Sequence, residues 1–75
     1  MIGELSVMDH TGDIKLIWDS DKEDEVQMAK DQFKAAKKKG YAAFSVNKKG
    51  DKGEVIYEFD PTAERIIMAP PLQGG

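Results

Sequence analysis

Apolar residues recur at steps of three and four positions between Asp21 and Lys39, which is the spacing of one face of an α-helix. The residues on this face are Val26, Ala29, Phe33 and Ala36. Ser20 and Glu23 have the spacing of a capping box, and Gly40 stands where a left-handed residue commonly ends a helix. Acidic side chains gather at the N-terminal end of this segment and lysines at its C-terminal end, in agreement with the helix dipole. We therefore predict a helix over Asp21 to Lys39.

Alternation of apolar and polar residues predicts a hairpin before the helix. Ile14, Leu16 and Trp18 alternate with Lys15, Ile17 and Asp19, the pattern of a half-buried strand. The turn-like residues 9–12 precede it, and a first strand over residues 2–8 would complete the hairpin, although Gly3 weakens that pattern. Trp18 is the largest apolar side chain and is expected to anchor the core.

Three further strands are predicted after the helix. In Tyr41 to Val46, alternate positions place Ala42, Phe44 and Val46 on one face. A polar loop over residues 48–53 leads to a strand over Glu54 to Phe59, with Val55, Tyr57 and Phe59 on one face. Residues 65–69 form a continuous apolar run, as expected of a strand covered on both sides.

This order of elements predicts an α+β fold in one small domain over residues 1–69, with a mixed sheet of four to five strands and one helix packed on one face. The chain has 75 residues, so its core is small and a spacious internal active site is not expected. It has no cysteine and one histidine, His10, which leaves little side-chain chemistry for an enzyme. We expect no enzyme activity, no cofactor and no metal ion.

Composition also bears on location. No signal peptide is recognisable, and no apolar run approaches the roughly 18 residues of a membrane span. We expect a soluble cytoplasmic protein that does not bind membranes. The net charge of −3 gives no general attraction to nucleic acid.

The last six residues, Pro70-Pro71-Leu72-Gln73-Gly74-Gly75, predict a flexible C-terminal tail. Two prolines hold a segment extended, and two residues without a Cβ let the backbone pass through a channel too narrow for side chains. A carboxylate at the end of such a tail can itself be the reacting group. The alternative is that Gly74 and Gly75 are an incidental end.

Residues 64–75 resemble the ending of the ubiquitin-like β-grasp sulfur carriers, the group that includes the small subunit of molybdopterin synthase and the thiamine sulfur carrier. That ending is a hydrophobic strand, one or two prolines, two variable residues and a terminal Gly-Gly. The resemblance implies a β-grasp fold and an E1-like activating enzyme that adenylates the carboxylate of Gly75 with ATP. A sulfur donor then gives a thiocarboxylate, or an enzyme cysteine gives a thioester for transfer to an acceptor protein.

In this family the exposed face of the sheet would dock on the activating enzyme. Ile67 or Leu72 could belong to that contact, although a large aliphatic residue in a strand is more often part of the core. The residues that contact a partner stay undetermined from the sequence.

Other interpretations stay open. The chain could be a small structural or interaction protein, for example from a phage or mobile element, that pairs through a sheet edge. Seven of the eleven basic residues lie between Lys34 and Lys52, with Tyr41 and Phe44 among them, and such a patch can bind single-stranded nucleic acid. A helix end and an exposed loop also favour these lysines, so nucleic acid is not an expected partner. The acids between Asp19 and Glu25 lack the spacing of a calcium loop.

Overall fold

Five strands and one helix make up the part of the chain that the computed structural model describes, which is residues 1–9, 12–46 and 53–71. The elements are β1 (Ile2–Asp9), β2 (Gly12–Asp19), α1 (Glu23–Lys38), β3 (Ala42–Val46), β4 (Glu54–Ile56) and β5 (Arg65–Ala69). The strand over the first residues is therefore formed, with Gly3 inside it.

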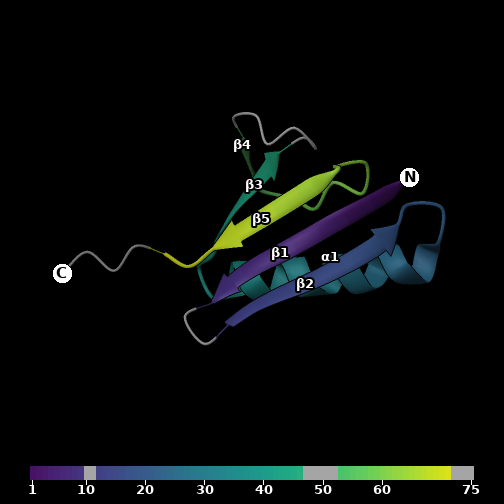
Figure 1. Cartoon of the computed structure of the whole chain (residues 1–75). Coiled ribbons are helices and arrows are strands. Elements are labelled where there is room, and N and C mark those ends of the chain that lie inside the picture. Colours follow the sequence, from purple (N-terminus) through teal and green to yellow (C-terminus); the bar gives the residue numbers. More distant parts are fainter. Residues whose placement is uncertain (10–11, 47–52, 72–75) are drawn as a thin grey trace.

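The strands form one mixed sheet in the order β2-β1-β5-β3-β4. β1 pairs with β2 as an antiparallel hairpin and with β5 in parallel, while β3 pairs antiparallel with both β5 and β4. The last strand of the chain thus lies in the centre of the sheet. The helix lies behind the sheet in Figure 1, and the opposite face is turned toward the viewer. This arrangement confirms the predicted α+β class and has the form of a β-grasp-like fold.

The core lies between α1 and the sheet because side chains on a strand alternate between the two faces. Leu5 and Val7 of β1 and Ile66 and Met68 of β5 point to the helix side and are buried. The other buried side chains are Trp18, Ala29, Phe33, Ala36, Ala43 and Ala63. The predicted helix face and the predicted position of Trp18 in the core are both confirmed.

The helix starts without the predicted capping box. Its N-cap residue is Lys22, which makes no side-chain capping bond. The Oε1 atom of Glu25 instead accepts a hydrogen bond from the backbone N–H of Asp19 at 3.0 Å, and Ser20 Oγ accepts one from the Met1 ammonium at 3.2 Å. The capping box was wrong because Ser20 lies before the helix in the β2–α1 connection, where it contacts the first residue of the chain.

The end of the helix agrees with the prediction. Gly40 has a φ of +90°, in the left-handed region that favours glycine. The N–H of Gly40 donates to the Lys37 carbonyl at 2.9 Å, and that of Tyr41 donates to the Ala36 carbonyl at 3.1 Å. These two bonds form a Schellman motif, which satisfies carbonyls that the helix leaves without partners.

Two strand predictions need correction. β4 ends at Ile56, and Phe59 packs into the core against Trp18 and Phe33 while Tyr57 is exposed, so the expected common face of the 54–59 segment is absent. β5 is central in the sheet but is covered by the helix on one side only, since Arg65, Ile67 and Ala69 are only partly buried. β3 and β4 do form a hairpin, while the predicted loop lies outside the described residues except for Gly53.

Candidate functional site

The sheet face opposite the helix is the candidate docking surface. One row of directly paired residues crosses all five strands in the order Lys15, Ser6, Ile67, Phe44 and Val55. Directly paired residues point to the same face of a sheet, so the row places polar side chains over β2 and β1 and apolar ones over β5, β3 and β4. We call Phe44, Val55 and Ile67 the apolar strip.

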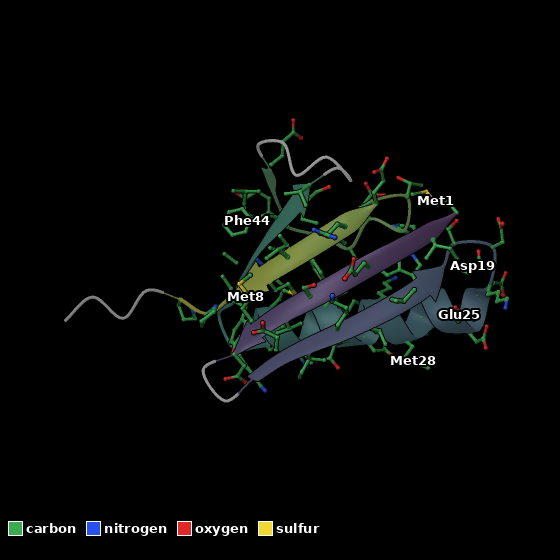
Figure 2. All side chains as sticks on the ribbon, in the orientation of Figure 1. Met1, Met8, Asp19, Glu25, Met28 and Phe44 are labelled. Atoms are coloured by element: carbon green, nitrogen blue, oxygen red, sulfur yellow. The ribbon has the colours of Figure 1, made fainter. Side chains whose placement is uncertain are left out.

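The apolar strip is accessible to a partner. Ile67 and Phe44 are partly buried, and Val55 is exposed. Met8 is also exposed and lies near the end of β1, while Phe44 lies over β3 (Figure 2). Ile67 is thus outside the core between sheet and helix, which places this candidate contact residue on the open face.

An ion-paired group of three side chains lies next to the apolar strip. Glu4 Oε1 is 3.0 Å from Lys15 Nζ, and Glu4 Oε2 is 3.3 Å from Arg65 Nη2. These contacts connect β2, β1 and β5, because Glu4 on β1 lies between the two basic residues. The carboxylate is 21% exposed, while both basic side chains are more accessible. The face therefore offers two cations beside an apolar surface.

The hydrogen bond from Lys15 lowers the pKa of Glu4 below its ordinary value of 4.5, and the positive charges of Lys15 and Arg65 act in the same direction. Partial burial of the carboxyl opposes them by disfavouring the charged form. The net shift is downward, so the charged form of Glu4, and with it the ion pairs, persists to a lower pH than for an ordinary glutamate.

The chain leaves the sheet at the end of β5. Ala69 is paired with Ala42 at the start of β3, and Pro70 and Pro71 follow as exposed residues. A Cβ on Gly40 would lie 3.7 Å from Pro71 Cγ, so this proline passes beside the end of α1. Of the predicted tail, Leu72, Gln73, Gly74 and Gly75 lie outside the described residues.

The other sequence candidates are placed as follows. Two acidic residues before and within the helix are engaged locally: Asp19 Oδ1 accepts from the backbone N–H of Asp21 at 2.9 Å, and Glu25 Oε2 is 3.6 Å from Lys22 Nζ. Residues 1–9, 12–46 and 53–71 contain no group of three or more histidine, cysteine or acidic side chains placed to hold a metal ion. His10 lies outside this part of the chain.

Sequence reasoning missed the ion-paired group and the position of Phe44 beside Ile67. Glu4, Lys15 and Arg65 come from both ends of the chain, and only the strand order brings them together. The alternation in β3 indicated that Phe44 shares a face with Ala42 and Val46, but it could not show that this face is the open one.

No helix in the described ranges is long and apolar enough to cross a membrane. Comparison of the chain with protein families, with curated protein sequences and with solved structures finds no match in any of the three.

Proposed function

We propose that this chain is a ubiquitin-like protein whose C-terminal Gly75 is adenylated and then used either for sulfur transfer or for attachment to another protein. The observation that carries the proposal is the position of β5: the central strand of a β-grasp-like sheet runs directly into two exposed prolines and the Gly-Gly sequence. The residue before the tail is held in a fixed position, because the central strand β5 is paired with a neighbouring strand on each side.

The chemistry needs an activating enzyme. The Gly75 carboxylate attacks the α-phosphorus of ATP, pyrophosphate leaves, and an acyl-adenylate forms. A sulfur nucleophile then attacks the carbonyl carbon and AMP leaves, which gives a thiocarboxylate or a thioester according to the donor. The chain itself acts as substrate, and its residues serve to bind the enzyme and to present the tail.

The open sheet face is the proposed contact with the activating enzyme. It combines the apolar strip with the exposed cations of Lys15 and Arg65, and interfaces typically pair an apolar centre with a polar rim. A standard interface buries about 800 Å² on each partner, so the docking area would extend over both halves of the face.

The first test is the intact mass of the protein isolated from its native cells, with a search for larger covalent species that contain it. This measurement shows whether the natural chain ends at Gly75. A mass increase equal to exchange of one oxygen for sulfur supports sulfur transfer, and an isopeptide bond from Gly75 to a lysine supports attachment.

A matched variant sharpens the test. The wild-type chain and a chain with one alanine added after Gly75 are incubated with ATP and extract of the native cells. Activation is followed by trapping the acyl group with hydroxylamine. We expect trapping of the wild type alone, because the added Cβ blocks a narrow channel. Equal behaviour of the two chains contradicts the proposal.

A second candidate function rests on the edge strand β2. This strand has eight residues, stands at the edge of the sheet, and carries the exposed side chains Ile14 and Ile17. Long exposed edges can pair with a strand of another chain. If the chain is such an interaction protein, the alanine extension leaves partner binding unchanged. A proline at whichever of positions 14 and 15 has its N–H turned away from β1 reduces partner binding, because it removes an outward donor of the edge.

A further inference from the structure

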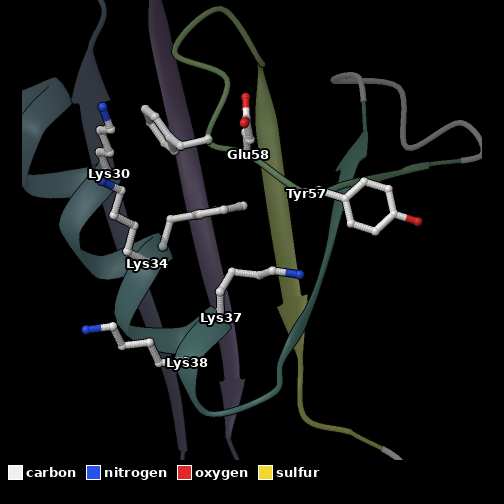
Figure 3. A pocket seen from close by; sticks show the side chains of 8 residues that line it. Lys30, Lys34, Lys37, Lys38, Tyr57 and Glu58 are labelled. Carbon is white, nitrogen blue, oxygen red and sulfur yellow. The ribbon is translucent and has the colours of Figure 1, made fainter.

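A cleft lies between α1 and the segment that follows β4 (Figure 3). It is on the helix side of the sheet, whereas the strand pairing places the apolar strip on the open face. Its volume is about 470 Å³, which falls in the range of ligand-binding clefts. Phe33 and Phe59, which also pack against each other in the core, give it an apolar floor. Tyr57 and Glu58 line the side opposite the helix.

Four lysines line the helical side of the cleft: Lys30, Lys34, Lys37 and Lys38. Lys30, Lys34 and Lys38 recur every four residues, so they form a row about 12 Å long on one side of the helix. None of the four forms an ion pair with a carboxylate among the described residues. Among the described residues that line the cleft, Glu58 alone is acidic, which leaves a surplus of positive charge there.

The helix dipole explains only part of this row. Its effect falls off within the last turn, and α1 ends at Lys38. Lys37 and Lys38 therefore lie where the dipole favours cations, whereas Lys30 and Lys34 lie further toward the helix start. The dipole at the helix end therefore does not account for the positions of Lys30 and Lys34.

An exposed aromatic ring faces these lysines. Tyr57 is 76% exposed and contributes nothing to the core. The Nζ atom of Lys37 lies 5.6 Å from the centre of its ring, and Figure 3 shows the Lys37 side chain extending from the helix toward the Tyr57 side. A ring held in this way beside cations is the arrangement that stacks a base next to bound phosphates.

We propose that this cleft binds single-stranded nucleic acid, with one base stacked on Tyr57 and the neighbouring phosphates on the lysines. Both an acidic peptide and a nucleic acid supply negative charge for the lysines, but only the nucleic acid also supplies flat bases that stack on the exposed Tyr57 ring. The lysine row extends along the helix, so an oligonucleotide with several phosphates can contact more of these lysines than a free nucleotide can. This inference does not depend on the proposed function, because it uses the helix side of the sheet and not the open face.

The test measures binding of a fluorescein-labelled oligothymidylate of about ten nucleotides by fluorescence anisotropy at several salt concentrations. About three phosphate contacts give a slope of log K against log salt near −2.1, or about an 18-fold loss of affinity between 50 and 200 mM salt. We expect the Lys34→Gln/Lys37→Gln double variant to bind weakly, with a slope near −0.7. The matched control, Lys22→Gln/Lys39→Gln, has the same net charge but alters lysines that do not line the cleft, and it should bind almost as the wild type does.

Tyr57→Ala should weaken binding at least about fivefold through lost stacking, and Tyr57→Phe should restore it. Unchanged melting temperatures show that the variants are folded. The proposal is overturned if the oligonucleotide does not bind, or if the two double variants lose affinity equally. It is also overturned if thymidine monophosphate binds as tightly as the oligonucleotide, which would indicate a free nucleotide, or if a polyglutamate peptide does so, which would indicate an acidic protein partner.

Discussion

Gly3 and Trp18 are directly paired across β1 and β2, and the indole ring of Trp18 occupies the space where a side chain at position 3 would begin. A Cβ on Gly3 would overlap the Cζ2 and Cε2 atoms of the ring. The absence of a side chain at Gly3 thus allows the largest core residue to pack directly against the β1 backbone. The same ring donates a hydrogen bond from Nε1 to the Pro61 carbonyl at 3.1 Å.

Gly3→Ala is therefore expected to lower the free energy of unfolding by about 1–3 kcal/mol, the usual cost of overpacking a core. Thermal or urea unfolding measures this change. The Gly3→Ala/Trp18→Phe double variant should lose less stability than the sum of the two single variants, because the smaller ring makes room for the new Cβ. Strict additivity would contradict the proposed contact.

The two aromatic residues after β4 should differ sharply in their effect on stability. Phe59 is partly buried and packs with ring centres 5.0 Å from Trp18 and 5.9 Å from Phe33, so Phe59→Ala should cost about 3 kcal/mol, the low end of the range for a buried phenylalanine. Tyr57→Ala should change stability by less than about 0.5 kcal/mol, because the ring is exposed. Thermal unfolding followed by circular dichroism compares the stability of the two variants. Equal losses of stability would contradict the different environments of the two rings and would favour one continuous strand over residues 54–59.

The contribution of Glu4 to stability should depend on pH. Its pKa is lowered in the folded state, chiefly by the hydrogen bond from Lys15. At pH values around and below 4.5, the unfolded chain therefore binds more protons at this residue than the folded chain does. The stabilisation is present above the ordinary value of 4.5 and is lost as pH falls through the lower folded value. Glu4→Gln should thus cost less than about 1 kcal/mol at pH 7 and progressively less below pH 4.5. Glu54→Gln, at an exposed strand residue, is the control, and a pH-independent difference for Glu4→Gln would contradict the assignment.

The connection before the helix should depend on Glu25 more than on Ser20. Glu25→Ala removes the acceptor of the Asp19 N–H bond and should cost about 0.5–1.5 kcal/mol. Ser20→Ala should cost less, because Ser20 caps no helical N–H and its hydroxyl contacts only the exposed Met1 ammonium. Urea unfolding of the two variants tests this order, and a larger loss for Ser20→Ala would indicate that the capping box forms after all.

Under the proposed function, Ile67→Ser should slow activation by about 5- to 30-fold, because an apolar residue at the centre of an interface carries a large part of the binding energy. Hydroxylamine trapping of the activated chain measures the rate. Met28→Ser is the control, since Met28 is an exposed apolar residue on α1. Equal activation rates for the two variants would contradict the proposal that the open sheet face contacts the activating enzyme.

The helix, the hairpin before it and the class of fold could be predicted because each depends on neighbours in the sequence. The repeat of Ala29, Phe33 and Ala36 sets a helical face, and alternation around Trp18 sets a strand face. Gly40 could be placed because a left-handed residue after a helix is a local conformational requirement. The capping box failed because two nearby side chains found other partners in the β2–α1 connection.

What the sequence by itself determined is thus the set of elements, their order, and the buried faces of the helix and of the strand around Trp18, because backbone periodicity is a local property. Only the tertiary structure decided the strand order, and with it the pairing of Glu4 with Lys15 and Arg65, the position of Ile67 beside Phe44, and the cleft between Lys37 and Tyr57. These contacts join residues far apart in the chain. They depend on which strand pairs with which and on the single face that one helix can cover.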